Sequence, residues 1–596
     1  MRATSILVLV LAACGGGGSG VDGGGGDDDG GGGGDPLEPV PAVDMDPSHY
    51  PANVWVTGAM AKVQPGDAAG DVKWALLMAG RNEVESFQVH VHADGAAADL
   101  EVTVSDLVDA ASGTHLAATV WREEYMNITT RSDANGLSGR VPDALIPAID
   151  PWFDEPRDAF PVTVPDGEAR SAWVDVRVPA DAPSGWYLGT VTVRLGGDVL
   201  AELPVRLGVW DFTLPPTASL ASGFGLGWNS MCVQAYGSYD VCGQYPGAGG
   251  DNDRAVELTH VAQTTMFLDY RVSLAGAVYY ASGGDWTAFD GRYGPLLDGT
   301  ADTNLAGARL THLWYTGDYG DATLLADWTD HFDQQGWLAR TSAYFCDEPP
   351  NGCSWTETQN RADGIKAAAP DLPTLLTTDL ELATANDLLD RVDILVPIVS
   401  WIEDRDRADQ RASYDGWLAD PAKHLWWYQS CVQHESCSNG SVGGATATWP
   451  SYMIDASPVR NRVFQWLAWI YRIEGELYYA TDYCWTATCG SGTDDPWVSQ
   501  YAFGGNGDGT LFYPGTPARI GGTTPVALPS IRLALLRDGM EDYEYLRLMA
   551  DADLGADADA AAASFITNTY TFSDDPADLE SARQTLGQRL HDLAHP

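Results

Sequence analysis

Two adjacent carboxylates that directly follow an apolar run are the residues of this chain best suited to chemistry. Residues 343–346, Ala-Tyr-Phe-Cys, are typical of a buried strand, and Asp347, Glu348 and Pro349 follow them. Two like charges side by side are costly to bury, so a strand rarely ends in this way without a reason. Neighbouring side chains on an extended backbone point to opposite sides, so this acid pair could serve two roles around one substrate. The alternative is that Asp347 caps a turn and Glu348 is solvated.

Strand-like runs alternate with longer helical segments from about residue 218 onward, and one of these runs ends at the acid pair. We expect strands at residues 223–228, 265–270, 310–315, 342–346, 373–378, 393–399, 424–429 and 475–482. About eight strands with helices between them predict a (β/α)8 TIM-like barrel. Catalytic side chains of such barrels collect at the C-terminal ends of the strands, which is where Asp347 and Glu348 would lie.

The region before this barrel is β-rich. Short alternating runs, such as residues 86–91 and 172–178, are separated by Gly, Pro and Asp turns. Several short strands without intervening helices predict a β-sandwich over residues 45–215. The predicted fold class is therefore multidomain, β plus α/β. An N-terminal β-sandwich would be followed by the barrel over residues 216–550 and a C-terminal helical tail over residues 551–596.

Aromatic residues are frequent at the other predicted strand ends. Sugars offer apolar CH faces that stack on such rings, while their hydroxyl groups need fixed hydrogen-bond partners. The candidate substrate-binding residues at these ends are Trp228, Asn229, Trp426, Trp427, Tyr428, Tyr483 and Trp485. Because Trp426 and Trp427 are neighbours on one strand, both cannot face the same side. Only about half of the rings are therefore expected to line a cleft, and the others would belong to the core.

The first residues of the chain have the layout of a secretory signal. A charged start precedes an apolar run that is too short to span a bilayer as a mature helix. Residues 11–14, Leu-Ala-Ala-Cys, resemble the bacterial lipobox, in which Cys14 is lipidated; an ordinary cleaved signal with a chance cysteine is the alternative. We expect a signal peptide over residues 1–14, a disordered Gly/Asp-rich tether over residues 15–44, and a lipid anchor at the outer membrane or cell surface.

Cysteine usage indicates export independently. The chain has nine cysteines, and those beyond Cys14 fall as close neighbours. Local pairs in an exported chain indicate short-loop disulfides. The pairs expected from proximity alone are Cys232 with Cys242, Cys346 with Cys353, Cys431 with Cys437, and Cys484 with Cys489. A zinc site is the weaker interpretation because no Cys-x-x-Cys pair occurs and no histidines cluster beside the cysteines.

The charge balance argues against nucleic-acid binding. With 33 basic and 83 acidic residues, the formal net charge is −50. Nucleic-acid binding depends on the neutralisation of phosphates by basic side chains, so neither DNA nor RNA is an expected partner. The membrane would be contacted only through the lipid anchor, and the oligomeric state is left open.

Several motifs occur in an order that resembles a known family. They are Phe-Cys-Asp-Glu-Pro at 345–349, Trp-Trp-Tyr at 426–428, Gly-Glu-Leu-Tyr-Tyr at 475–479, Gly-Asp-Gly-Thr-Leu-Phe-Tyr-Pro-Gly at 507–515, Ser-Ile-Arg-Leu at 530–533, and Leu-Arg-Asp-Gly-Met-Glu-Asp-Tyr-Glu-Tyr-Leu at 536–546. The series resembles the bacterial glycoside hydrolase family 123-like catalytic domain, grouped as domain of unknown function 4091. Residues 81–83 and 85–88 also look like the β-sandwich domain of that group.

The resemblance implies a retaining exo-β-N-acetylgalactosaminidase-like enzyme whose substrate supplies the nucleophile. Glu348 would protonate the glycosidic oxygen and then activate water, while Asp347 would orient the 2-acetamido group that attacks the anomeric carbon. Tyr428 is the first choice, and Tyr483 the second, for a hydrogen bond to the acetamido oxygen. The implied partner is a glycan or glycoconjugate, and neither a cofactor nor a metal is expected.

Two other functions remain open from the sequence. One is a glycosidase that acts on sugars without an acetamido group, because a shared fold does not fix the substrate. The other is a carbohydrate-binding surface lipoprotein that keeps the barrel without turnover. The charged run at 537–546 is expected to have a structural role, tying the last barrel helix in place.

Overall fold

The computed structural model describes most of the chain after its N-terminal segment. The described residues are 35–95, 98–227, 230–237, 262–276, 284–404, 406–431, 437, 449–490 and 492–595. Cys14, the signal and most of the tether lie outside them, as do Trp228, Asn229 and the predicted Cys232–Cys242 pair, for which Cys242 is not described.

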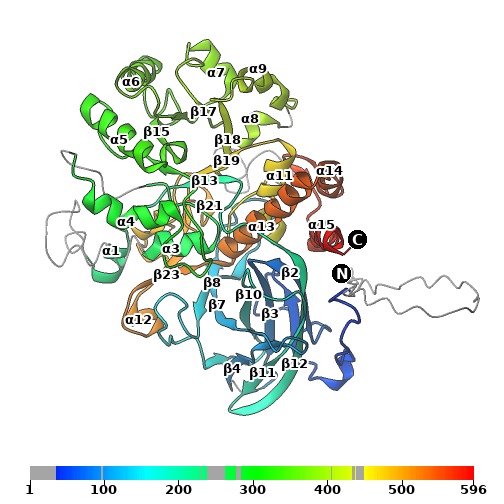
Figure 1. The fold of residues 1–596 in the computed structure, drawn as a ribbon. Helices are drawn as coiled ribbons and strands as arrows, with labels where there is room; N and C mark the ends of the chain where they lie inside the picture. The colour runs from blue at the N-terminus through cyan, green and yellow to red at the C-terminus, as the bar shows by residue number, and fades with distance from the viewer. Residues whose placement is uncertain are drawn as a thin grey trace, which may run out of the picture.

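Two antiparallel-rich sheets form the N-terminal domain (Figure 1). The first has the order β1 (Val54–Gly58), β3 (Glu83–His92), β10 (Ala169–Val178), β7 (Ala118–Ile128), β8 (Gly139–Pro147). The second has the order β2 (Ala75–Arg81), β12 (Asp198–Thr213), β11 (Gly185–Leu195), β4 (Ala98–Val104), β9 (Val162–Val164), with β5 (Leu107–Asp109) and β6 (His115–Leu116) at its side. Alternation places one face of each sheet in a shared core: in β4, Leu100 and Val102 are buried while Glu101 and Thr103 between them are exposed.

Seven parallel strands form the sheet of the second domain. Their order is β13 (Ala221–Phe224), β19 (Gly475–Tyr478), β18 (His424–Tyr428), β17 (Ile394–Leu395), β16 (Thr374–Leu376), β15 (Thr341–Cys346), β14 (Leu313–Trp314). Isolated β-bridges connect the two edge strands of this sheet through one segment. Phe224 of β13 pairs with Leu274, and Trp314 of β14 pairs with Gly276. The segment 273–276 thus stands where the remaining barrel strand is expected, and the β-sandwich followed by a barrel is confirmed.

One predicted strand is misplaced. Residues 265–270 were expected to form the second barrel strand, but α3 (Ala262–Asp269) covers nearly all of them. Met266, Phe267 and Leu268 are consecutive and all buried. A short apolar run that is buried on every side has no periodicity that separates a helix from a strand, so the assignment fails at this point.

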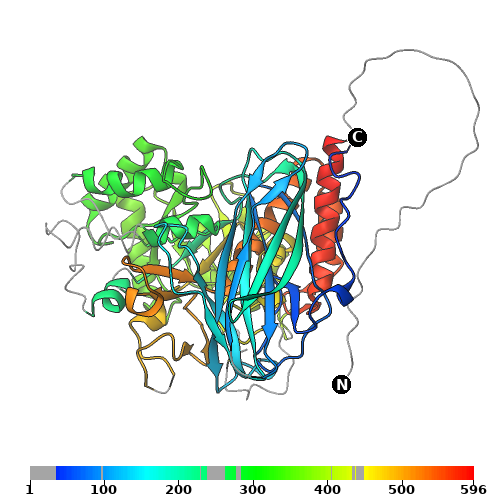
Figure 2. The ribbon, with the colours of Figure 1, turned by 90° about the horizontal axis from the view of Figure 1, so that it is seen from below.

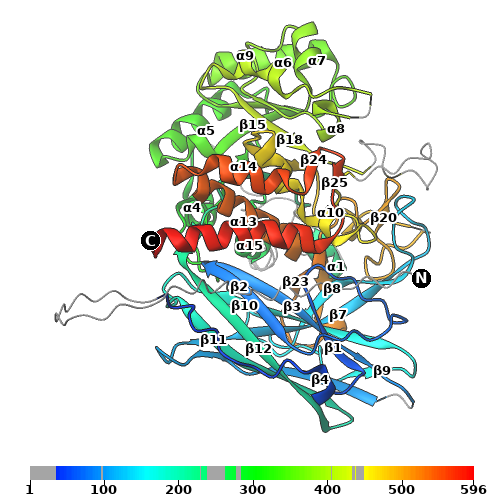
Figure 3. The ribbon, with the colours of Figure 1, turned by 90° about the vertical axis from the view of Figure 1, so that its right-hand side faces the viewer.

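Helices cover the outside of the barrel and fill the space between the domains (Figures 1 and 3). The longer ones are α4 (Thr287–Asp298), α5 (Ala322–Gln335), α6 (Trp355–Ala368), α13 (Ile531–Asp551), α14 (Gly555–Ala563) and α15 (Pro576–Ala594). The shorter ones are α1 (Ser230–Tyr236), α7 (Leu380–Ala385), α8 (Val399–Ile402), α9 (Asp415–Leu418), α10 (Pro458–Arg462), α11 (Phe464–Ile470) and α12 (Pro517–Ile520). Within the described ranges, no helix has both the length and the apolar character that a membrane span requires.

Short antiparallel pairs complete the second domain. They are β20 (Tyr501–Ala502) with β21 (Gly505–Asn506), β22 (Phe512–Gly515) with β23 (Val526–Pro529), and β24 (Ile566–Asn568) with β25 (Thr571–Phe572). α15 lies beside the sandwich strands (Figure 2).

A buried ionic network joins the last helices to both domains. It consists of Glu83 and Asp175 from the sandwich, Arg462 from α10, Arg537 and Asp542 from α13, and Arg583 from α15. We call these six residues the interface network. Tyr545 adds a 2.6 Å hydrogen bond from its hydroxyl to Glu83. The charged run at 537–546 therefore ties its helix to the barrel and also to the sandwich.

Candidate active site

The acid pair lies at the C-terminal end of β15, at the mouth of the barrel. Ala343 and Phe345 within the strand are buried, whereas Asp347 is exposed and Glu348 is half-buried. The change from buried strand to accessible carboxylates therefore occurs within two residues. This position matches the one that catalytic side chains occupy in barrel enzymes.

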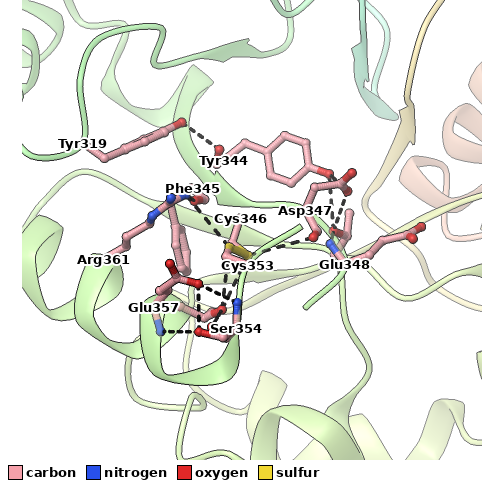
Figure 4. The surroundings of a disulfide bond; sticks show 12 residues. Tyr319, Tyr344, Phe345, Cys346, Asp347, Glu348, Cys353, Ser354, Glu357 and Arg361 are labelled. Carbon is pink, nitrogen blue, oxygen red and sulfur yellow. Dashed lines mark hydrogen bonds between the residues drawn. A yellow bond between two sulfur atoms is a disulfide. The ribbon is translucent and has the colours of Figure 1, made fainter. Parts of the chain in front are cut away.

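The two carboxylates have different hydroxyl partners and point apart (Figure 4). Asp347 accepts hydrogen bonds from the Tyr344 hydroxyl at 2.5 Å and from Thr377 Oγ1 at 3.2 Å. Glu348 Oε1 accepts one from the Tyr428 hydroxyl at 2.5 Å. Burial and the nearby acid raise the pKa of each tyrosine well above its usual value, through Asp347 for Tyr344 and through Glu348 for Tyr428. Both tyrosines therefore remain protonated donors.

A strained turn holds the pair. Glu348 has a φ of 40°, in the left-handed region that costs a non-glycine residue about 1–3 kcal/mol. Its N–H donates to Thr377 Oγ1 at 2.7 Å, and its carbonyl accepts from the N–H of Asn351 at 2.7 Å. Gly352 closes the turn by donating to the carbonyl of Asp347 at 3.0 Å, and a Cβ at position 352 would lie 2.2 Å from that oxygen. Only glycine fits there.

Disulfides brace the loops around this mouth. The pairs Cys346–Cys353, Cys431–Cys437 and Cys484–Cys489 are formed, as expected from their spacing. The first encloses the acid pair in a short ring and leads directly into α6. The start of α6 is fixed by a capping box between Ser354 and Glu357.

The aromatic candidates on β18 divide between the two faces of the strand. Trp426 lies inside the barrel, 4.7 Å from the ring of His312, and Gly475 leaves room for it because a Cβ there would meet its ring at 2.2 Å. Trp427 instead stacks on Phe464 of α11 at 4.8 Å and is fully buried. The placement of Trp427 argues against its predicted role in stacking on a sugar, because alternation turns it away from the barrel interior.

The two aromatic candidates after β19 differ in burial. Tyr483 is half-buried and packs 4.9 Å from the ring of Phe503, which is itself exposed. Trp485 is buried, donates from Nε1 to the carbonyl of Phe512 at 2.9 Å, and packs edge-on against that ring. Trp485 is therefore a core residue in this structure, contrary to its predicted place in a sugar site.

Thr377 and Tyr344 are site residues that the sequence reasoning missed. Thr377 follows β16 directly and contacts both members of the acid pair through the hydrogen bonds given above. The available signal was its position, since the residue after a barrel strand belongs to the same mouth as the acid pair. Tyr344 was treated as part of a buried strand, yet its ring lies 5.3 Å from that of Trp314 and its hydroxyl reaches Asp347.

Two other carboxyl groups lie beyond the end of β19 and are buried. Burial raises the pKa of Asp482 and that of Asp508 to about 6. Asp508 accepts from the Tyr478 hydroxyl at 3.1 Å, and Asp482 accepts from the backbone N–H of Gly227 at 2.9 Å. Each of these two carboxyl groups therefore holds loop residues at the barrel mouth through buried hydrogen bonds.

A pocket of about 440 Å³ opens on the same rim. Asp379, Trp401, Arg407 and Gln410 are among its lining residues, and Asp379 follows Thr377 by two positions. No group of three or more His, Cys, Asp or Glu side chains in the described part of the chain is arranged to hold a metal ion.

Comparisons with known proteins agree with this two-domain architecture. A family model described as the glycoside hydrolase 123 catalytic domain matches residues 317–549, and one described as the glycoside hydrolase 123 N-terminal domain matches residues 61–195. A solved family 123 glycoside hydrolase from Clostridium perfringens, whose structure addresses glycolipid glycan hydrolysis, has a TM-score of 0.62 at 12% identity and covers 91% of this chain and 98% of its own.

Another solved structure shows a weaker likeness. A family 5 xyloglucanase from Bacteroides ovatus has a TM-score of 0.26 at 9% identity over 78% of this chain and 98% of its own. No curated protein sequence matches the chain. The two family models together match more than half of the chain, in the order and with the domain types that the structure displays. This chain is therefore a glycoside hydrolase and belongs to glycoside hydrolase family 123.

Proposed function

We propose that this glycoside hydrolase is a retaining exo-β-N-acetylgalactosaminidase-like enzyme that uses the 2-acetamido group of its substrate as the nucleophile. Glu348 protonates the glycosidic oxygen as the acetamido carbonyl attacks the anomeric carbon. Asp347 holds and polarises the acetamido N–H during this attack. Glu348 then removes a proton from the water that opens the cyclic intermediate, so the anomeric configuration is retained.

The observation that carries this proposal is the divergence of two adjacent carboxylates from a single turn. In the usual retaining and inverting mechanisms, the two carboxyl groups lie on opposite sides of the scissile bond. Asp347 and Glu348 come from one strand end, so they approach the sugar from one side. A nucleophile supplied by the substrate removes the need for a carboxylate on the other side. The Tyr428 hydroxyl donates to Glu348 Oε1, so it lies beside the acid that we propose for protonation of the leaving group.

We further propose that the enzyme acts outside the cytoplasm, held by a lipid on Cys14 and the Gly/Asp-rich tether. Disulfides between three cysteine pairs support an oxidising compartment. The solved relative from Clostridium perfringens concerns the glycan of a glycolipid, and a glycolipid or other glycoconjugate is the substrate class that we propose here. A tethered enzyme would be well placed for glycans at or beyond the cell surface. Palmitate labelling of Cys14 and its loss in Cys14→Ala would test the anchor.

The test of the reaction is hydrolysis of 4-nitrophenyl glycosides. We expect release of 4-nitrophenol from the β-N-acetylgalactosaminide, a slower rate with the β-N-acetylglucosaminide, and none with the β-galactoside, which has no acetamido group. Glu348→Gln should lower kcat by about 10²- to 10⁴-fold, the range typical of general acid–base catalysis. A thiazoline that mimics the bound intermediate should inhibit the wild type.

Each contrary outcome selects another function. Hydrolysis of the β-galactoside without thiazoline inhibition would identify a glycosidase for non-acetamido sugars. Glycan binding that survives Glu348→Gln, with no hydrolysis by the folded and oxidised wild type, would identify a carbohydrate-binding surface lipoprotein.

A further inference from the structure

The outer side of β15 carries polar contacts that no chemical step uses. The pairing of β15 with β16 shifts register between Tyr344 and Cys346, which is the signature of a β-bulge just before the acid pair. A bulge interrupts the ladder of backbone hydrogen bonds, bends the strand and re-aims the side chains that follow it. Side chains from outside the sheet contact the carbonyls at this bulge. The carbonyl of Tyr344 accepts from the Tyr319 hydroxyl at 2.7 Å, and that of Phe345 accepts from Arg361 Nη1 at 3.0 Å (Figure 4).

Arg361 donates to the strand and not to a carboxylate. Its guanidinium group donates to a neutral carbonyl and lies 3.9 Å from Cys353 Sγ, and it forms no ion pair with any residue that the structure describes. Hydrogen bonds from a charged donor are roughly twice as strong as neutral ones. The charge of Arg361 is therefore directed at the end of the strand that carries the acids.

The disulfide acts on the same segment. Cys346 ends β15, and its bond to Cys353 ties the strand end to the residue that precedes α6 by two positions. Arg361 lies on α6, so the strand end, the turn and the helix form one closed unit. A residue with the strained backbone of Glu348 persists only where its surroundings over-determine its conformation. The contacts of Tyr319 and Arg361 and the disulfide restrain this backbone from the outer side of β15.

We propose that Tyr319, Arg361 and the Cys346–Cys353 disulfide form a rear clamp that positions the acid pair for glycoside hydrolysis. Tyr319 and Arg361 are positioning residues, since they contact the backbone of β15 and not the carboxylates. The inference rests on the proposed roles of Asp347 and Glu348. It adds that the rate of the chemical step depends on side chains on the outer face of the barrel.

A pocket between α5 and α6, lined in part by Arg361, provides a direct test of this inference. Its volume is about 500 Å³, and Asp318, Tyr319 and Arg361 are among the residues that line it. Truncation of Arg361 to alanine would enlarge a space that is already accessible from outside. Free guanidinium is small enough to enter it and to donate to the carbonyl of Phe345.

The experiment compares Arg361→Ala, Arg361→Lys and Tyr319→Phe with the wild type on the best 4-nitrophenyl glycoside. We expect Arg361→Ala to lower kcat by about 10- to 100-fold, as for a misplacement of reacting groups by about 1 Å, with KM changed less than twofold. Millimolar guanidinium chloride should restore part of kcat in Arg361→Ala and none in Glu348→Gln. Arg361→Lys should retain part of the rate, and Tyr319→Phe should lose about 3- to 10-fold, the value of one neutral hydrogen bond.

The matched control is Arg391→Ala. Arg391 contacts Asp363 on the same helix, α6, through Nε at 2.6 Å, at an exposed site away from β15. The Arg391→Ala variant should keep kcat within twofold of the wild-type value. An equal loss in Arg391→Ala, or no loss in both Arg361→Ala and Tyr319→Phe, would overturn the rear clamp.

A second measurement separates this inference from the proposed function. Deuterium exchange of a peptide that spans residues 341–353 should speed up in Tyr319→Phe and Arg361→Lys, and not in Arg391→Ala. A wild type without glycosidase activity would contradict the proposed function. Unchanged exchange in Tyr319→Phe and Arg361→Lys would contradict the rear clamp, whatever the activity.

Discussion

The interface network and the acid pair both contain carboxylates, but these carboxylates differ in burial and in their partners. In the interface network, Glu83, Asp175 and Asp542 are buried and each lies within ion-pair distance of an arginine. At the mouth, Asp347 is exposed and is held by the hydroxyls of Tyr344 and Thr377. An arginine fixes a buried carboxylate in its charged form, which suits structure. Hydroxyl partners orient a carboxylate and leave it accessible to a substrate.

The same substitution at a buried carboxylate and at the mouth should therefore have opposite effects, and the larger effect is expected at the buried one. The buried example is Asp143, which lies outside the interface network but also joins the sandwich to α13. Asp143 of β8 accepts two hydrogen bonds from Arg532 of α13, at 2.9 and 2.8 Å, and neither side chain is exposed. Asp143→Asn leaves the charge of Arg532 buried and uncompensated, which should lower the free energy of unfolding by about 3–5 kcal/mol. Urea denaturation followed by tryptophan fluorescence measures this, and kcat per folded molecule should stay near that of the wild type. A loss below about 1 kcal/mol would show that this pair contributes little.

Asp347→Asn is the counterpart at the mouth. We expect kcat to fall by about 10²- to 10³-fold, in the range of a lost electrostatic contact in a transition state, or about 3–4 kcal/mol. The free energy of unfolding should change by less than about 0.5 kcal/mol, because the side chain is exposed. Steady-state kinetics and urea denaturation on the same preparation give both values. A large loss of stability with normal kcat would reverse the assignment of the two regions.

The sequence predicted the architecture better than it predicted which side chains face the site. The sandwich, the barrel and three disulfides could be inferred because they depend on local pattern and spacing. Strands of a parallel barrel are buried on both faces, so their apolar runs do not reveal which residues point inward. Trp426 and Trp427 illustrate this: alternation required that they differ, but only the register with Gly475 placed Trp426 inside.

Contacts between distant segments were also beyond reach. The hydroxyl of Thr377 lies beside an acid 30 positions earlier, and Tyr428 reaches one 80 positions earlier. The sequence placed the acid pair and Tyr428 at one mouth, but not Thr377, and the pairing of these residues depends on strand order and on the bulge in β15. The bulge has no composition signal of its own, since the residues around it are ordinary strand residues.

Glu476 sharpens the comparison because it has neutral partners like the acid pair but is buried like the interface network. It accepts from the Tyr452 hydroxyl at 2.5 Å and from Gln465 Nε2 at 2.8 Å, and burial raises its pKa to about 8. The folded protein therefore holds this proton below about pH 8, whereas the unfolded chain loses it above about 4.5. The stability that Glu476 contributes is fully present below pH 4.5 and is lost as the pH rises to about 8.

Glu476→Gln should remove this pH dependence. The difference in unfolding free energy between Glu476→Gln and the wild type should move in favour of the variant by about 2–3 kcal/mol between pH 5 and pH 7.5, since one proton is linked over that interval. Denaturation at the two pH values measures the change, and the exposed Glu381→Gln serves as the control. An unchanged difference would mean that Glu476 is charged in the folded protein and that hydroxyl and amide donors suffice to hold a buried carboxylate.

Tyr428→Phe gives the smallest effect and tests whether a hydroxyl at the mouth tunes an acid as well as orienting it. The substitution removes the 2.5 Å hydrogen bond to Glu348 Oε1 and keeps the buried aromatic ring at the end of β18. A hydrogen bond to the charged form of an acid favours that form, so its loss favours the protonated acid. The alkaline limb of the pH–rate profile should therefore move to higher pH by about half a unit to one unit, while kcat at the optimum falls about tenfold, or about 1.4 kcal/mol. A fall in kcat with no movement of that limb would make Tyr428 a contact to the substrate instead, which is the role that the sequence first suggested for it.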